Sequence, residues 1–189
     1  MIRIKQVFYL SFFLFMGCKQ NTVSKNDPNQ QDWIFLFNGK DLSGWDIKFA
    51  NQDLNVNYKN TVRIQDSMLR IAYDEYETFD NAYAHIYYDQ AFSYYKLKFD
   101  YRFYGDQVKG AESWNIRNSG IMLHSQSAES NSYGQFFPVS IEIQFLGGQG
   151  AENRPTGNVC TPGTVVEMFG TIDYSHCIDS SAKTYHGDQ

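Results

Sequence analysis

Apolar and polar residues alternate one by one along several short stretches of this chain. A period of two is typical of β-strands that bury one face and expose the other. Residues 96–103 alternate most regularly, with apolar side chains at odd positions and charged side chains at even positions. Residues 139–145 repeat the pattern and place Ser140, Glu142 and Gln144 on one face. Both segments are therefore predicted to be strands with a single buried side.

Shorter segments extend this pattern. Residues 62–64 and 69–71 predict a β-hairpin that turns at Asp66-Ser67, and further strands are predicted over 84–87 and 164–168. No window shows a long helical stripe with apolar residues at i, i+3, i+4 and i+7. Clusters of glycine, asparagine, aspartate and serine separate the strands. The chain therefore predicts an all-β sandwich of antiparallel sheets.

The N-terminal residues predict export. Arg3 and Lys5 precede an apolar run over residues 7–16, which is too short to span a bilayer and ends at Gly17-Cys18. This order of charge, apolar stretch and Gly-Cys indicates a lipoprotein signal peptide, with Cys18 as the acylated residue. The alternative is an ordinary cleaved signal followed by an incidental cysteine.

Composition divides the rest of the chain into a tether and a domain. Residues 1–17 form the predicted signal peptide, and the polar residues 18–32 cannot bury enough apolar area to fold. The folded domain is predicted over residues 33–189. Loss of the signal peptide removes two basic residues and no acidic one, which moves the formal charge from −5 to −7. A negative chain argues against nucleic acid or an anionic lipid surface as the partner, because both require clustered basic residues.

Two cysteines follow Cys18 in the sequence. In an oxidising envelope, Cys160 and Cys177 would most simply form a disulfide with each other. A zinc site that uses His176 beside Cys177 is the alternative. No Cys-x-x-Cys motif and no second close histidine completes a zinc ligand set, so the disulfide is the favoured prediction.

Four stretches resemble one bacterial family in the same order along the chain. The first is an apolar strand that leads through an Asn-Gly turn to Leu-x-Gly-Trp; the four stretches are residues 36–45, 118–121, 140–144 and 157–164, the last leading to His176-Cys177 and residues 183–189. From about Trp33 to its end, the chain is thus similar to the 3-keto-disaccharide hydrolase or 3-keto-glucoside-1,2-lyase/3-keto-2-hydroxy-glucal hydratase family. The resemblance implies a concanavalin-like jelly roll whose concave face binds sugar. In the family, further strands follow the loop at residues 186–189, so we expect a domain that is incomplete at its C-terminus.

The resemblance also indicates which glycoside-cleaving reaction to expect. A retaining glycosidase needs two carboxylates about 5 to 5.5 Å apart, whereas the predicted strand over 139–145 carries Glu142 alone. The reaction that the family implies needs only one base, because a 3-keto group acidifies the hydrogen on C2 of the sugar. One base removes that proton, and the enolate expels the aglycone from C1 to leave a 2-hydroxy-glucal that can be hydrated.

The candidate site residues are polar side chains near the predicted sugar-binding face. Glu142 and His124 are the catalytic candidates, and the substrate-binding candidates are Arg117, Asn118, Gln144 and His186. Alternation over residues 120–124 sets His124 on the face opposite Ile121 and Leu123, so it and Glu142 are expected to project from neighbouring strands toward one polar concavity. The Ser119-Gly120 pair is predicted to form a turn into the strand that ends at His124. A divalent metal ion held by His124, Glu142 and His176 is an alternative centre. Trp114 and Tyr185 are candidates for stacking on sugar rings, while Trp45 and His85 are assigned structural roles. No phosphate loop or dinucleotide fingerprint is present, so no nucleotide cofactor is expected.

These observations predict a lipid-anchored protein of the bacterial cell envelope. Its substrate would be an oxidised di- or oligosaccharide or another 3-keto-glycoside, and its membrane contact would be the lipid at Cys18. The alternative, from a different functional class, is a non-catalytic carbohydrate-binding or interaction module with the same fold.

Overall fold

The computed structural model describes residues 33–150 and 153–183. Within these ranges no helix is long and apolar enough to cross a membrane. The elements are β1 (Trp45–Phe49), η1 (Tyr58–Asn60), β2 (Val62–Gln65), β3 (Met68–Ile71), β4 (Ala84–Tyr88), η2 (Ser113–Asn115), β5 (Asn118–Leu123), β6 (Ile141–Leu146), β7 (Asn158–Cys160), β8 (Val166–Met168), β9 (Thr171–Asp173) and β10 (Cys177–Ile178). The predicted signal peptide, the tether, Cys18, Tyr185 and His186 lie outside the described residues.

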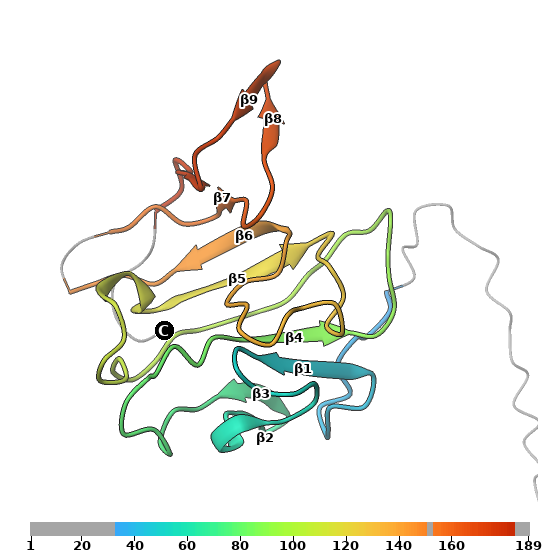
Figure 1. The fold of residues 1–189 in the computed structure, drawn as a ribbon, viewed down its shortest axis with the longest axis vertical. Helices are drawn as coiled ribbons and strands as arrows, with labels where there is room; N and C mark the ends of the chain where they lie inside the picture. Colours follow the sequence, from blue (N-terminus) through green and yellow to red (C-terminus); the bar gives the residue numbers. More distant parts are fainter. Residues whose placement is uncertain (1–32, 151–152, 184–189) are drawn as a thin grey trace, which may run out of the picture. The chain divides into compact units, whose positions relative to one another are not determined.

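The strands of the described chain pair in antiparallel fashion and form four hydrogen-bonded groups (Figure 1). β1 pairs with β4, β2 with β3 and β8 with β9, while a four-stranded sheet has the order β10-β7-β6-β5. The prediction of an all-β sandwich is confirmed. The strands do not merge into two continuous sheets among the described residues, because most are short and irregular segments separate them.

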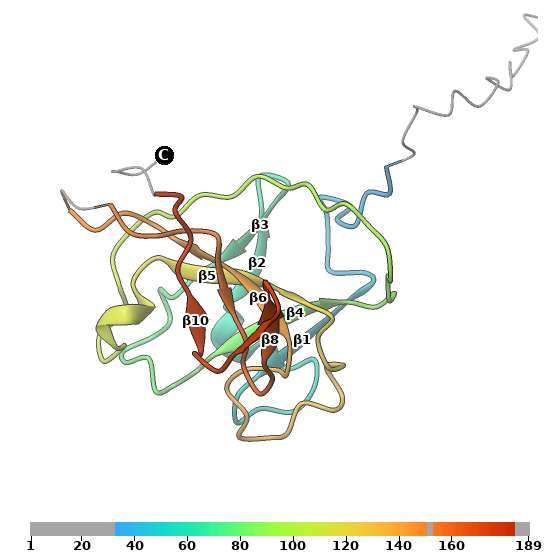
Figure 2. The ribbon, with the colours of Figure 1, turned by 90° about the horizontal axis from the view of Figure 1, so that it is seen from above.

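The apolar core lies between the β1–β4 pair and the β2–β3 hairpin (Figure 2). Ile47, Phe49 and Val62 form its buried centre. Because side chains alternate along a strand, the other face of the β1–β4 pair carries Lys48, which lies opposite His85. One side of this pair is therefore apolar and faces the hairpin, and the other side is polar.

The β2–β3 hairpin turns where the sequence predicts. Asp66 and Ser67 adopt positive φ angles of 51° and 58°, which is the backbone of a two-residue type I′ turn. The twist of such a turn matches that of the strands it joins, so Gln65 pairs with Met68 directly beside the turn. This part of the prediction is confirmed.

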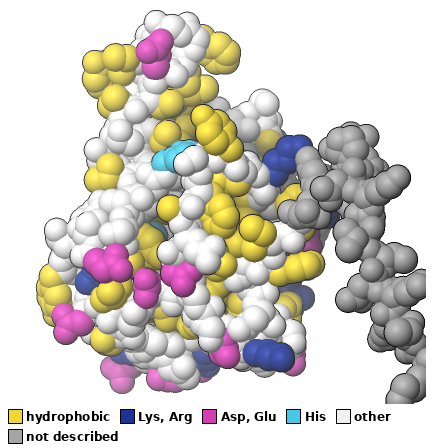
Figure 3. All heavy atoms as spheres, turned by 90° about the vertical axis from the view of Figure 1, so that its right-hand side faces the viewer, with side chains coloured by type: hydrophobic (Ala, Val, Ile, Leu, Met, Phe, Trp, Pro, Cys, Tyr) yellow, Lys and Arg dark blue, Asp and Glu magenta, His cyan; other side chains and the backbone are white. Residues whose placement is uncertain are grey.

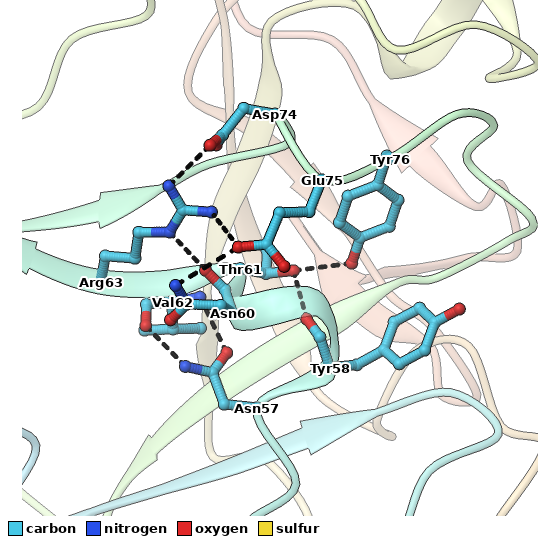
Figure 4. Close-up of polar contacts among 9 residues, drawn as sticks. All are labelled: Asn57, Tyr58, Asn60, Thr61, Val62, Arg63, Asp74, Glu75 and Tyr76. Carbon is cyan, nitrogen blue, oxygen red and sulfur yellow. Dashed lines mark hydrogen bonds and ion pairs between the residues drawn. The ribbon is translucent and has the colours of Figure 1, made fainter.

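Polar contacts tie the hairpin to the loop that follows it (Figure 4). Arg63 in β2 forms ion pairs with Asp74 and Glu75, with N–O distances of 2.9 and 3.1 Å. Thr61 is buried, and its hydroxyl lies 2.6 Å from that of Tyr76. The carboxylates of the ion pairs are exposed and gain little from pairing. The buried hydroxyl, by contrast, has no water to replace a lost partner.

Thr61→Val is expected to lower the free energy of unfolding by about 1 to 3 kcal/mol. Valine keeps the size of threonine but removes the hydroxyl that donates to the carbonyl of Tyr58 and accepts from Tyr76. Urea denaturation measures the change. Arg63→Gln is the control, because it removes exposed ion pairs and should have the smaller effect; equal effects would contradict this assignment.

Residues 96–103, the most regular alternating segment, do not form a strand in the structure. Phe99 and Tyr101 place their rings 5.4 and 4.8 Å from the ring of Phe145 in β6. They nevertheless remain 43% and 52% exposed. The prediction of a strand with one buried face is therefore wrong here, because no strand of the described chain pairs with this segment to complete a layer.

The β8–β9 hairpin, which includes the strand predicted over 164–168, projects from the four-stranded sheet (Figure 1). Hydrophobic side chains gather on it (Figure 3, top), among them the fully exposed Phe169 at its turn. An open groove of about 430 Å³ follows the hairpin. Its lining within the described chain holds one carboxylate, Asp173, and no histidine. The groove therefore lacks the groups that the predicted chemistry requires.

Candidate active site

The four-stranded sheet places Glu142 among polar and small side chains, with the apolar Met122 directly opposite it on β5. β5 and β6 pair so that Gly120 lies opposite Gln144, and β7 places Asn158 opposite Gln144 and Cys160 opposite Glu142. Directly opposite residues of an antiparallel pair point to the same face, so these five residues share one side of the sheet. The isoleucines that alternate with them along β6 point to the other side. The predicted alternation of this strand is confirmed.

The side chain of Glu142 folds over Gly120 on the neighbouring strand. A methyl group at Gly120 would lie 2.2 Å from Oε1 and 2.6 Å from Cγ of Glu142, so a residue without a side chain leaves the room that the carboxyl occupies. Burial raises the pKa of Glu142 to about 7, because poorly hydrated surroundings disfavour the charged form. A carboxyl with a pKa near neutrality is suited to accept a proton from a substrate.

Gln144 is held by the next strand. The side-chain amide of the buried Asn158 donates to Oε1 of Gln144 at 3.0 Å, and the backbone N–H of Ser180 donates to Oδ1 of Asn158 at 2.9 Å. With its oxygen engaged in this way, Gln144 is left with its amide NH₂ group as the donor for another partner.

Cys160 and Cys177 form the predicted disulfide. The two residues are directly opposite each other in the β7–β10 ladder, with their Cα atoms 4.1 Å apart. The bond therefore joins the edge strand β10 to the strand beside Glu142. The zinc alternative at these cysteines is wrong, because both sulfur atoms are engaged in the disulfide.

Strand alternation does not extend to His124. β5 and β6 are neighbours as expected, but their ladder ends at Leu123 and Ile141. His124 follows with a φ of 49°, so the alternation of β5 does not determine which way its side chain points. The side chain is exposed, its ring centre lies 6.2 Å from that of Tyr95, and no contact in the described chain joins it to Glu142.

Arg117 and Asn118 lie at the start of β5, and their side chains donate hydrogen bonds to backbone carbonyl groups. Arg117 donates to the carbonyl of Gly148 at 3.2 Å, and the side-chain amide of Asn118 donates to the carbonyl of Trp114 at 3.0 Å. Asn118 belongs to the strand itself, as does the Ser119-Gly120 pair that was predicted to form a turn. That part of the prediction is wrong.

The proposed metal ligands do not meet in the described chain, where no three His, Cys, Asp or Glu side chains could hold an ion. His176 is exposed and next to Cys177, and its carbonyl accepts the backbone N–H of Thr161. His124, Glu142 and His176 therefore do not fit a three-ligand centre.

His85 lies on the polar face of β4, and burial lowers its pKa to about 4. Its ring centre is 6.1 Å from that of Phe137. An uncharged, half-buried imidazole against an aromatic ring fits the structural role that the sequence predicts. Trp45, also predicted to be structural, is half-buried, and its indole N–H donates to the carbonyl of Leu36.

Sequence reasoning missed the roles of Gly120 and Asn158. A lone glycine within an alternating segment often marks the close approach of another group, so Gly120 carried a usable signal. Asn158 carried none, because its partner Gln144 is distant in sequence and the pairing of β6 with β7 brings them together.

A protein-family model described as the 3-keto-alpha-glucoside-1,2-lyase-like domain matches residues 32–186. The match covers most of the chain and includes every strand of the described structure. It agrees with the resemblance carried by the four sequence motifs. No curated protein and no solved structure matches the chain.

Proposed function

Because this chain belongs to the 3-keto-alpha-glucoside-1,2-lyase-like family, we propose that it is an enzyme that cleaves 3-keto-glycosides, with Glu142 as the base. The family indicates a carbohydrate substrate. The observation that carries the proposal is the poorly hydrated carboxyl of Glu142, which lies over Gly120 on the polar side of the sheet. A single base of this kind suffices for a sugar whose C2 hydrogen is acidified by a 3-keto group.

In the first step, the carboxylate of Glu142 takes the proton from C2, and the C–H electrons form an enolate with its negative charge on the oxygen at C3. In the second step, the ketone re-forms, a double bond forms between C1 and C2, and the bond from C1 to the aglycone oxygen breaks. The protonated Glu142 returns its proton to the leaving oxygen. The products are the free aglycone and a 3-keto-2-hydroxy-glucal, and addition of water across C1 and C2 gives the 3-keto sugar.

Gln144 is our candidate for stabilising the enolate oxygen. It lies two residues after Glu142 in β6 and points to the same face of the sheet. The Cα atoms of the two residues are about 7 Å apart. Its carbonyl oxygen accepts from Asn158, which leaves the NH₂ group to donate to a developing negative charge. A sugar ring placed between the two side chains would thus meet a base on one side and a donor on the other.

The direct test is to incubate the full-length protein with a 3-keto-disaccharide and measure release of the aglycone sugar. Turnover that produces a 3-keto-2-hydroxy-glucal supports elimination, and direct formation of the 3-keto sugar supports net hydrolysis. Binding without turnover, with or without added divalent metal, would favour a non-catalytic carbohydrate-binding module instead.

Gly120→Ala is expected to reduce kcat/KM for a 3-keto-disaccharide at least tenfold, with a smaller effect on stability. The new methyl group would occupy the place of the Glu142 side chain from Cγ to Oε1, so this side chain must rotate away from Gly120 as a whole. Misplacing a reacting group by about 1 Å can cost about 10²-fold in rate. Steady-state kinetics and thermal denaturation measure the two effects, and Gly134→Ala is the control, because the added methyl group would lie 3.5 Å from its nearest neighbour.

We also propose that acylation of Cys18 anchors the protein to the cell envelope, as the order of charge, apolar run and Gly-Cys suggests. Cys18→Ser should move the protein from the membrane fraction to the soluble fraction. Retention of the variant in the membrane fraction would contradict the lipid anchor.

A further inference from the structure

Three aromatic side chains, those of Tyr83, Trp114 and Phe137, lie together near the start of β4. Trp114 in η2 stacks on Tyr83, with ring centres 5.9 Å apart and planes 6° from parallel. The ring centre of Phe137 lies 4.9 Å from that of Tyr83 and 6.4 Å from that of Trp114. Neighbouring rings thus cover part of the indole, yet 48% of Trp114 remains exposed.

The cluster brings together segments that precede three different strands: Tyr83 directly precedes β4, and the ring centre of Phe137 lies 6.1 Å from that of His85 in β4. Trp114 and Phe137 each precede a strand by four residues, β5 and β6 respectively. Since β5 and β6 are antiparallel, they begin at opposite ends of a ladder that is about 17 Å long. The two rings nevertheless lie 6.4 Å apart, so the segments before the two strands fold toward each other and meet at Tyr83.

Asn118 connects the cluster to the side of the sheet that carries Glu142. Its side-chain amide donates to the carbonyl of Trp114, and it shares its face of β5 with Gly120, two residues further along. Gly120 is the residue that the Glu142 carboxyl covers. The backbone of Trp114 is therefore anchored to Asn118, two residues along β5 from the glycine that the carboxyl covers.

We propose that the exposed face of Trp114 is a stacking platform for the aglycone pyranose ring of the substrate. This inference rests on the proposed function, which places the 3-keto ring at Glu142 and leaves the next ring of a disaccharide to lie along β5. The face of an indole ring is electron-rich and attracts the C–H groups on the flat side of a pyranose. Stacking on Tyr83 and the hydrogen bond from Asn118 hold the platform in place, so binding costs little side-chain entropy.

The test compares a 3-keto-disaccharide with a 3-keto-glycoside that has a methyl aglycone. Trp114→Ala should raise KM for the disaccharide about three- to tenfold, the effect of losing one aromatic contact, and leave both kinetic constants for the methyl glycoside within about twofold. Trp114→Phe should retain part of the affinity. Tyr174→Ala removes an exposed aromatic residue from the end of the β8–β9 hairpin. It should leave the kinetic constants for both substrates unchanged.

A second measurement separates the platform from the catalytic proposal. Calorimetry with a disaccharide that lacks the keto group reports binding without turnover, and the wild-type protein should bind it more tightly than Trp114→Ala. Binding that depends on Trp114 in a protein without turnover would support the platform and contradict the proposed reaction. An unchanged KM, or an equal rise of KM for both substrates, would contradict the platform, as would a wild-type protein that binds no disaccharide.

Discussion

Glu142→Gln is expected to lower kcat/KM for a 3-keto-disaccharide by about 10²- to 10⁴-fold, the usual contribution of a general base. Glutamine keeps the size of the side chain and its place over Gly120 but cannot accept the proton from C2. The binding affinity for the disaccharide should change far less than the rate, because the substitution removes proton transfer rather than a contact surface.

Glu167→Gln is the matched control. Glu167 lies on the projecting β8–β9 hairpin and is exposed, so its neutralisation should leave turnover unchanged. If Glu142→Gln retains turnover within about threefold of the wild-type protein, Glu142 is not the base.

The pKa of Glu142 also predicts a pH dependence. The carboxylate must be ionised to act as a base, so kcat/KM should rise as the pH increases through about 7. This limb should be absent in Glu142→Gln. A profile that is flat between about pH 5 and 8 would show that another group with a different pKa accepts the proton.

The same shift predicts how stability depends on pH. The folded-state pKa of Glu142 is raised from 4.5 to about 7, so its contribution to stability is fully present below the lower value and is lost as the pH rises through the higher one. Glutamine cannot ionise. Glu142→Gln should therefore be more stable than the wild-type protein at about pH 8, by on the order of 2 kcal/mol, and the advantage should disappear near pH 4. A variant that is less stable at the higher pH would contradict a poorly hydrated carboxyl.

Local patterns in the sequence predicted the fold where the deciding interactions are themselves local. Alternation over residues 62–71 and a polar pair at Asp66-Ser67 determine a hairpin whose strands touch at once. Residues 96–103 show a clearer alternation, yet they form no ladder in the described structure. A strand forms only when another segment pairs with it. The alternation of its sequence indicates which face can be buried but does not indicate which segment will pair with it.

The candidate site shows the same division. Alternation predicted correctly that Glu142 and Gln144 share a face of β6. It did not extend to His124, because the left-handed backbone at that residue lies just beyond the last pair of the ladder, where alternation no longer applies. The residues that define the surroundings of Glu142 come from neighbouring strands: Gly120 provides space and Asn158 orients Gln144. Their roles depend on register, which one sequence does not specify.

Replacing both Cys160 and Cys177 by serine is expected to lower the free energy of unfolding by about 3 kcal/mol, because the disulfide closes a loop of 17 residues and restricts the unfolded chain. For a domain of this size, that loss corresponds to a fall of roughly 6 to 12 °C in Tm. Thermal denaturation with and without a thiol reductant measures the effect. The reductant should lower the Tm of the wild-type protein and leave that of the double variant unchanged.

The disulfide should also matter for turnover. β10 is two residues long and pairs with β7 alone in the described chain, so without the covalent bond its attachment rests on a very short ladder. Cys160 lies opposite Glu142 in the adjoining ladder and is fully buried, and fraying of β10 would admit water to that side of the sheet. The pKa of Glu142 should then fall toward its ordinary value, and the rise of kcat/KM should move to lower pH in the double variant. A double variant with wild-type Tm and an unshifted pH profile would show that the bond braces neither the sheet nor the site.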